Sequence, residues 1–175
     1  MNRYAIIAFA CLLLLPATTL SQSRSRTTKR APSTKTKASI EAQAAEIRMA
    51  GATKVADQVK ILTRFLYLLG GVAKGIEQID EAAKKNEASP AALQQNETNK
   101  TTVKTSLRNV REGLDALEIY FRSTPGLQSY YLRLAGSASG AANAEAQAAM
   151  GQFDQSGRTL LGVVNRLTDV LLIMR

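Results

Sequence analysis

The side chains that most often carry out catalysis or bind metals are scarce in this chain of 175 residues. The sequence contains no His, no Trp and a single cysteine, Cys11. Imidazole and thiolate groups supply most general bases, activated nucleophiles and zinc ligands. Di-iron helical bundles also need Glu-x-x-His motifs, which a chain without His cannot contain. The sequence therefore predicts a protein that is not an enzyme and that uses no cofactor and no metal.

Carboxylates at short spacing are the remaining candidates for acid–base chemistry. Asp115 and Glu118 flank an apolar stripe at helical spacing from Arg111 and Arg122, and this pattern predicts surface ion pairs. Asp80 lies beside a break in the apolar pattern, so it is the one carboxylate expected near the core. The sequence shows no glycine-rich phosphate loop and no nucleophile elbow.

The amino-terminal residues have the pattern of an export signal. Arg3 precedes an apolar run from Tyr4 to Ala17, and the single cysteine lies inside that run. A membrane-spanning helix needs roughly 20 apolar residues, and this run is shorter. The pattern predicts a signal peptide over residues 1–21, which gives a periplasmic or extracellular protein without a thiol. Because basic residues follow the run more closely than they precede it, a membrane anchor formed by residues 4–20 is the alternative.

Residues 22–38 form a basic segment of Ser, Thr, Lys and Arg, which predicts a disordered linker. Without this segment and Arg3, 16 Lys and Arg remain against 14 Asp and Glu, so residues 39–175 carry a net charge of only +2. The linker is either a solvated spacer or a tether to an anionic membrane or cell-envelope polymer. Nucleic acid is the least favoured partner, because the linker has no aromatic side chains for base stacking. The six candidate anion-binding residues are Arg24, Arg26, Lys29, Arg30, Lys35 and Lys37.

From Ser39 onward, strong helix formers predominate and apolar residues recur at steps of three and four. The first stripe consists of Val55, Val59, Leu62, Leu66 and Leu69, followed by Val72, Ile76, Ile79 and Ala83. The two series are out of phase at Gly70-Gly71, which predicts either a kink that admits a neighbouring helix closely or a functional hinge. Ser89 and Pro90 predict the start of a second helix that ends near Arg122.

The second helix has the most regular stripe in the chain: Val103, Leu107, Val110, Leu114, Leu117 and Phe121. A short segment over residues 127–136 follows, and its Tyr130-Tyr131 pair predicts a packed turn that caps one end of the bundle. The last helix is expected to be continuous for roughly 36 residues, near 50 Å at the rise of an α-helix. Its predicted stripe is Ala142, Ala146, Ala149, Phe153, Leu160, Val164, Leu167, Leu171 and Met174.

Short connections between long helices predict an all-α fold, an elongated antiparallel three-helix bundle over residues 39–175. The alternative is a four-helix bundle in which residues 39–52 and 127–136 form helices of their own. Several apolar residues widen the stripes and predict either contact with two neighbouring helices or a dimer surface. These residues are Ile61, Leu161, Val163, Val170 and Leu172.

These features predict an exported, non-enzymatic bundle that acts through helix-mediated contacts with a protein partner or with itself. An adaptor, an assembly component and an inhibitor all fit this prediction. The alternative is a protein that binds a membrane or envelope surface through the basic linker and amphipathic helices. Asn96 and Asn99 begin two N-glycosylation sequons, which matter only in a host that glycosylates secreted proteins.

Overall fold

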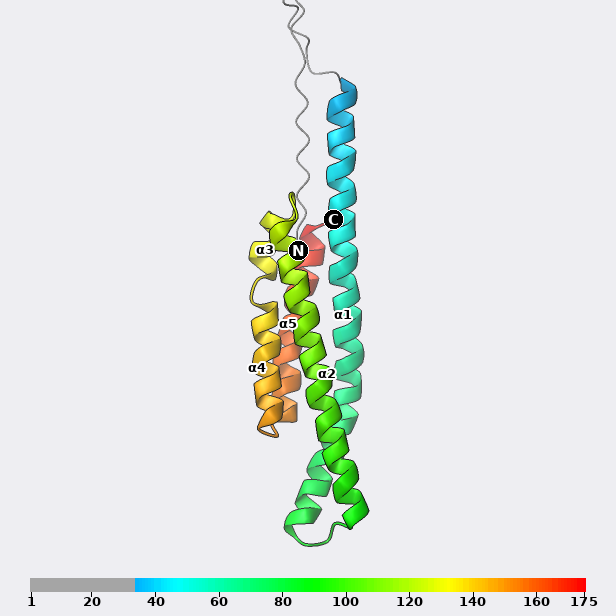
Figure 1. Ribbon diagram of the computed structural model, residues 1–175, viewed down its shortest axis with the longest axis vertical. Helices are drawn as coiled ribbons and strands as arrows, with labels where there is room; N and C mark the ends of the chain where they lie inside the picture. The colour runs from blue at the N-terminus through cyan, green and yellow to red at the C-terminus, as the bar shows by residue number, and fades with distance from the viewer. Residues whose placement is uncertain (1–33) are drawn as a thin grey trace, which may run out of the picture. The chain divides into compact units, whose positions relative to one another are not determined.

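The computed structural model describes residues 34–175, which fold into helices with no strand in that range. This result confirms the predicted all-helical class. The helices are α1 (Thr34–Lys84), α2 (Pro90–Ser123), α3 (Gln128–Leu134), α4 (Ser137–Ala149) and α5 (Phe153–Ile173), as Figure 1 shows. Residues 1–33 lie outside the described range, and with them the predicted signal peptide and most of the predicted linker.

Four of these helices surround one core. α1 contacts α2 and α5, and α4 contacts the same two helices from the other side. Neighbours in this arrangement run antiparallel, and the short helix α3 contacts α2 and α5 at one end (Figure 1). Antiparallel packing follows from the short connections, which leave no length of chain for a crossover.

The α1–α2 connection forms where the sequence predicts it. Asn86 adopts a positive φ of 59° just after α1, a conformation that Asn tolerates better than most residues. The Oγ atom of Ser89 accepts a hydrogen bond of 3.2 Å from the backbone N–H of Ala92, and Pro90 occupies the first helical position. This cap satisfies one of the unpaired N–H groups at the start of α2.

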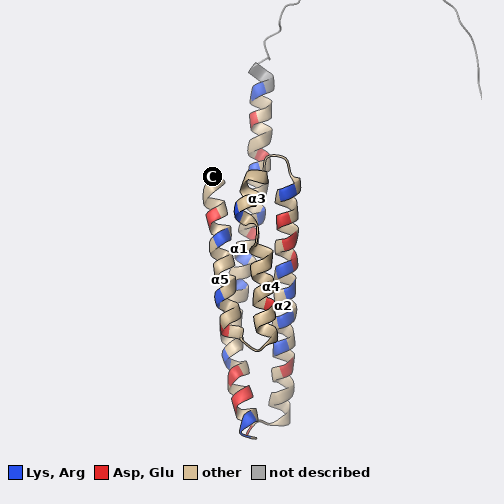
Figure 2. Ribbon diagram, turned by 90° about the vertical axis from the view of Figure 1, so that its left-hand side faces the viewer, with Lys and Arg blue, Asp and Glu red and all other residues tan. Residues whose placement is uncertain are grey.

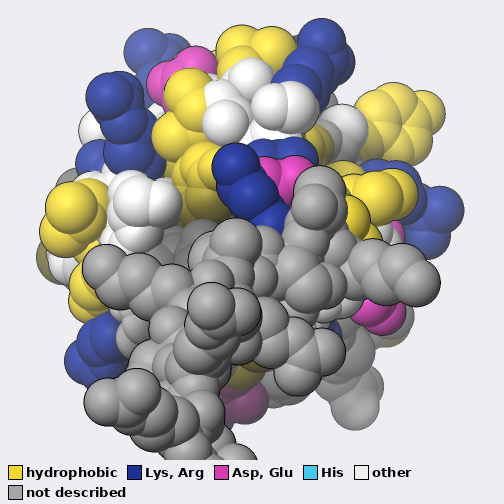
Figure 3. All heavy atoms as spheres, turned by 90° about the horizontal axis from the view of Figure 1, so that it is seen from above, with side chains coloured by type: hydrophobic (Ala, Val, Ile, Leu, Met, Phe, Trp, Pro, Cys, Tyr) yellow, Lys and Arg dark blue, Asp and Glu magenta, His cyan; other side chains and the backbone are white. Residues whose placement is uncertain are grey.

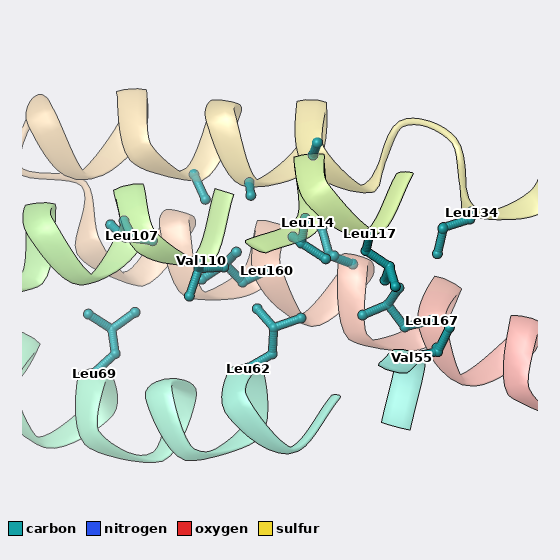
Figure 4. Close-up of a cluster of buried hydrophobic side chains, with 14 of the residues drawn as sticks. Val55, Leu62, Leu69, Leu107, Val110, Leu114, Leu117, Leu134, Leu160 and Leu167 are labelled. Carbon is teal, nitrogen blue, oxygen red and sulfur yellow. The ribbon is translucent and has the colours of Figure 1, made fainter. Parts of the chain in front are cut away.

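The core consists of leucine and valine side chains from α1, α2 and α5. Val55, Leu62 and Leu69 of α1 point toward Leu107, Val110, Leu114 and Leu117 of α2 and toward Leu160 and Leu167 of α5 (Figure 4). All six residues of the predicted α2 stripe are buried, which confirms that stripe. A fully buried leucine contributes about 1.5–3 kcal/mol relative to an exposed one, so this stripe is a main source of stability.

The prediction of a single last helix is wrong. Met150, Gly151 and Gln152 separate α4 from α5, and Gly151 adopts a φ of 80°. Glycine enters this left-handed conformation without a steric penalty, so the chain reverses here. The reversal lets the alanine-rich half pack between α2 and α5 instead of extending past the bundle.

The turn also changes which alanines are buried. The predicted stripe ran through Ala142, Ala146 and Ala149, but Ala146 and Ala149 are exposed and Ala142 is only half-buried. The residues of α4 that are buried in the core are Ala138, Ala141, Ala144 and Ala148. The prediction failed because its stripe was phased on the large residues of α5, and the turn breaks that phase.

Small side chains allow α4 to lie very close to α5. A Cβ atom added at Gly140 would lie 2.7 Å from Cγ2 of Val163, far inside a normal carbon–carbon contact. The helix α4 carries a single charged residue, Glu145. By contrast, both basic and acidic side chains occur along α2 (Figure 2). The alanine-rich helix is therefore held by close apolar packing on two sides.

The helix α1 begins at Thr34, ahead of the predicted start at Ser39, so residues 34–38 are helical. Residues 39–52 are not a helix of their own but part of α1, which continues past the end of the bundle (Figures 1 and 2). Gly51 marks the level at which the bundle begins. An added Cβ there would lie 3.0 Å from Cε of Met174 and 3.1 Å from Cδ1 of Leu127.

The short helix α3 covers this end of the bundle. Tyr130 and Tyr131 are half-buried and pack against the core, as the capping-turn prediction expected. Viewed from this end, Lys and Arg side chains are spread around the rim between apolar and acidic ones (Figure 3). The charge visible here is therefore distributed and does not form a single basic face.

Candidate docking groove

The carboxylate expected near the core joins α1 to α2. Oδ1 of Asp80 accepts hydrogen bonds of 2.7 Å from Nδ2 of Asn96 and of 2.7 Å from Nζ of Lys100. Lys100 also donates to Oε1 of Glu97 at 3.0 Å. These contacts, the hydrogen bond to Asp80 above all, raise the pKa of Lys100 above its ordinary value of 10.5. This cluster holds together the end of the α1–α2 hairpin, and its side chains are all engaged in structural contacts.

Asn96 was not expected to be buried. Its side chain is 1% exposed, and its Oδ1 accepts no hydrogen bond from the described residues. The Nδ2 atom, to which a glycan would be attached, is already bonded to Asp80. Asn99 is half-buried and hydrogen-bonded to Gln95. The two sequons therefore differ in accessibility in the folded chain, a difference that their identical motif does not show.

The carboxylates at the α2–α4 interface are also structural. Asp115 lies 3.7 Å from Arg111, which confirms one predicted surface ion pair. Glu118 does not form the expected pair: its Oε1 accepts a hydrogen bond of 2.9 Å from the backbone N–H of Ala138, at the start of α4. A carboxylate is favoured there by the unpaired N–H groups and the helix dipole. Arg111 additionally donates to Glu145 of α4 at 2.9 Å.

No group of His, Cys, Asp and Glu within residues 34–175 is arranged to hold a metal ion. One hollow of the bundle is lined mainly by apolar side chains. It has a volume of about 430 Å³ and lies between α1 and α5. We call it the α1–α5 groove; its lining residues are Leu66, Leu69, Gly70, Ala73, Lys74, Glu77, Phe153, Asp154, Gly157, Arg158 and Leu161.

Two glycines, one from each helix, create the α1–α5 groove. A Cβ added at Gly157 would lie 3.6 Å from Cδ2 of Leu69 and 3.9 Å from Cδ2 of Leu66, which are ordinary contact distances. Apart from its chain neighbours and the adjacent backbone of α1, no heavy atom of residues 34–175 lies within 4 Å of a Cβ added at Gly70. The glycines thus leave a hollow beside the half-buried Leu66 and the buried Leu69, which larger residues would have filled.

This geometry corrects the interpretation of Gly70-Gly71. α1 continues through both residues as one helix, and among the described residues no atom of another helix lies within 4 Å of an added Cβ at Gly71. The prediction of a close helix approach at this pair is therefore wrong. Instead, Gly70 opens a hollow. The proposal of a functional hinge at this point stays a prediction.

The edges of the α1–α5 groove carry charges of both signs. Lys74 and Glu77 lie on α1, and Asp154 and Arg158 form an ion pair of 2.9 Å on α5. Leu161 lies at the same edge and is 53% exposed. An apolar floor with polar edges can bind the apolar face of a helix and orient it through its charges.

The residues that widen the predicted stripes divide into two groups. Val163 and Val170 are buried, which agrees with a helix that contacts two neighbours. Ile61, Leu161 and Leu172 are 49%, 53% and 55% exposed, so they remain candidates for a contact surface. The sequence indicates that Leu161 widens an apolar stripe, but nothing in the sequence indicates that Leu161 lies beside Gly70.

The predicted anion-binding residues are mostly beyond the described range. Arg24, Arg26, Lys29 and Arg30 fall within residues 1–33. Lys35 belongs to the first turn of α1, and Lys37 is exposed and lies 4.0 Å from Glu41. An exposed pair at this distance contributes little to stability, so the charge of Lys37 stays accessible to an anionic surface.

Within residues 34–175, no helix combines the length and the apolar character that crossing a membrane requires. Comparison with known proteins adds no constraint on function. No protein-family model, no curated protein and no solved structure matches the chain.

Proposed function

We propose that this protein is a non-enzymatic, exported helical bundle that acts by binding a helix of a partner protein. An adaptor, an assembly component and an inhibitor all work in this way. The packing of α1, α2, α4 and α5 around one core supports a four-helix arrangement for the folded part. The apolar run of residues 4–17 supports export after removal of a signal peptide.

The single observation that carries the proposal is the α1–α5 groove. Leu66 is half-buried and Leu69 is 4% exposed at the floor of the groove, and Gly70 and Gly157 contribute no side chain that would fill it. Exposing apolar surface is unfavourable by roughly 25 cal/mol per Å², so a partner that covers the groove gains that free energy. A hollow of about 430 Å³ accommodates anchor side chains from one face of a helix.

The chemistry of the described carboxylates supports binding over catalysis. Asp80, Glu118 and Glu145 each accept hydrogen bonds that join two helices. Groups committed to such contacts are not available to transfer protons to a substrate.

Site-specific photocrosslinking tests this proposal. A benzophenone amino acid replaces Leu161, at the edge of the groove, in the protein expressed by its own host. The same replacement at Leu172 is the matched control, because both leucines lie on α5 and are 53% and 55% exposed. A discrete adduct from position 161 and none from position 172 supports the proposal. Equal labelling from both positions, or none from either, contradicts it.

The second candidate function is binding to an anionic membrane or envelope polymer. It is favoured by the concentration of six basic residues between Gln22 and Ala38, against a net charge of only +2 in the rest of the mature chain. Attraction of this kind contributes about 1 kcal/mol per basic residue near an anionic surface and is screened by salt. A salt series with anionic vesicles separates this function from helix binding.

A further inference from the structure

Another hollow lies between the short helix α3 and α5, which contact each other (Figure 2). Its volume is about 650 Å³, within the range of sites that hold small ligands. The four α5 residues that line it follow one another at steps of 3, 1 and 3, so they share one face of that helix. We call it the α3–α5 hollow; its lining residues are Leu132, Arg133, Gly162, Asn165, Arg166 and Asp169.

The α3–α5 hollow is open because Gly162 contributes no side chain. Apart from its chain neighbours and the adjacent backbone of α5, no heavy atom of residues 34–175 lies within 4 Å of a Cβ added at Gly162. Leu132 of α3 is 78% exposed and supplies an apolar side to the hollow. The hollow shares no lining residue with the α1–α5 groove, so a ligand bound here leaves that groove free.

The guanidinium group of Arg166 is held in place at this hollow. Its Nη1 donates a hydrogen bond of 3.0 Å to the carbonyl oxygen of Ala135, between α3 and α4. Gly136 permits this approach: it has a φ of 89°, and a Cβ added there would lie 2.7 Å from Nη1 of Arg166. A guanidinium group has five N–H donors. The bond to Ala135 therefore fixes the group and leaves other donors for a ligand, which lowers the entropy cost of binding.

The other polar side chains of the α3–α5 hollow have no partner in the part of the chain that the structure describes. Arg133, Asn165 and Asp169 take part in no side-chain hydrogen bond or ion pair with residues 34–175. Arg166 and Asp169 lie three residues apart on α5, yet they form no ion pair. The fold itself therefore leaves the donors of two arginines and an amide unused around one hollow.

We propose that the α3–α5 hollow binds a carboxylate that carries an apolar group. The planar fork of a guanidinium group matches the two oxygens of a carboxylate, and Arg133 and Arg166 supply two such groups. Leu132 packs against the apolar group of the ligand. Two arginines and Asp169 give the lining a net charge of +1, which suits one negative charge better than the −1.5 to −2 of a phosphate group at about pH 7. This inference does not rest on the proposed docking of a partner helix.

NMR spectroscopy of ¹⁵N-labelled residues 22–175, titrated with sodium hexanoate at low salt, tests the site. A site of millimolar affinity is largely occupied at about 10 mM ligand, so saturable shifts are expected for the backbone amides of Gly136, Gly162 and Asn165. Binding should weaken as the salt concentration rises, because the attraction is electrostatic. Acetate is expected to bind at least ~5-fold more weakly than hexanoate, since it has no apolar chain.

Two arginine variants and a matched control test the charged contacts. Arg133→Gln and Arg166→Gln are each expected to weaken hexanoate binding at least ~5-fold, because each removes a charge-assisted contact. Arg158→Gln makes the same change of charge on α5, outside the hollow, where Arg158 is paired with Asp154. This control is expected to bind hexanoate as the unaltered chain does. Circular dichroism of each variant confirms that it is folded.

A glycine variant tests the space itself without changing any charge. Gly162→Leu is expected to abolish hexanoate binding, because its side chain fills the α3–α5 hollow. Gly71→Leu adds the same side chain to α1, outside the hollow, and is expected to leave binding unchanged. Binding that survives Gly162→Leu would overturn the proposed location.

Further probes identify the ligand class and its source. Acetylated glycyl-leucine that binds at least ~10-fold more tightly than hexanoate would assign the site to the C-terminus of a peptide, whereas equal or weaker binding would assign it to a small acid. The C-terminal amide of this dipeptide is expected not to bind. The inference would be overturned by an amide that binds as well as the acid, by inorganic phosphate that binds as well as hexanoate, by equal losses in all three arginine variants, or by the absence of saturable shifts.

Discussion

Because α4 and α5 approach each other closely at Gly140, a larger residue at this position is expected to destabilise the fold. In Gly140→Ala, the new Cβ atom would lie 2.7 Å from Cγ2 of Val163, which is buried. A relaxed carbon–carbon contact is about 3.5–4.0 Å, so the two helices must separate by roughly 1 Å. Overpacking of this kind costs about 1–3 kcal/mol, whereas the better helix propensity of alanine recovers about 1 kcal/mol. A net loss of up to about 2 kcal/mol is expected.

Gly71→Ala is the matched control, since it makes the same change within a helix. Among residues 34–175, no atom of another helix lies within 4 Å of the added Cβ, so the propensity gain of up to about 1 kcal/mol is not offset. The two variants should therefore differ by the overpacking cost alone, about 1–3 kcal/mol, which is about 4–12 °C in Tm for a domain of this size. Thermal and urea unfolding followed by circular dichroism measure the difference. If Gly140→Ala proved as stable as Gly71→Ala, the packing of α4 against α5 would be wrong.

Three further predictions concern the core, the Asp80 cluster and the basic linker. Leu114→Asp places a charge at a fully buried position, so urea unfolding should show a loss of at least about 4 kcal/mol or no folded state; a melt that scarcely moved would show that the buried face is misassigned. Lys100→Met should cost about 1 kcal/mol at neutral pH. The pKa of Lys100 is raised in the folded chain, so this difference should be complete below pH 10.5 and vanish as the pH rises through the raised value; a constant gap across that range would refute the contact with Asp80. Neutralising the basic residues of 22–38 should abolish binding to anionic vesicles at low salt and leave the Tm unchanged, whereas a lower Tm would mean that the segment is structural.

The sequence predicts the helices whose stripes are regular and made of large residues. The α2 stripe from Val103 to Phe121 repeats without interruption, and only one face of that helix can be buried. The end of α1 and the start of α2 were equally predictable, because Ser89 and Pro90 have strong local preferences. These features depend on residues close together in the chain.

The reversal at Gly151 could not be predicted by the same reasoning. Gly140, Gly151 and Gly157 look alike in sequence, yet only Gly151 forms the turn. Gly140 instead permits close helix packing, and Gly157 opens the groove. Alanine-rich segments also indicate no unique buried face, because alanine is small enough for either side of a helix.

The α1–α5 groove depends on contacts between distant parts of the chain. Gly70 and Gly157 come together only after α5 packs antiparallel to α1, and the sequence predicted neither the turn nor that pairing. The hydrogen bond from the backbone N–H of Ala138, at the start of α4, to Glu118 was not predicted for the same reason. Its donor is a backbone group, and the identity of Ala138 does not indicate a partner for it. Such partners become visible only when the tertiary arrangement is known.

The measurement that tests the docking groove most directly combines the benzophenone probe at Leu161 with two glycine variants. Gly70→Leu places a side chain in the open space of the groove, whereas Gly71→Leu adds the same side chain at the next position, outside the groove lining. If a partner helix occupies the groove, the adduct from position 161 should disappear in Gly70→Leu and persist in Gly71→Leu. An adduct that survives both substitutions unchanged would contradict the proposal that the groove is the docking site.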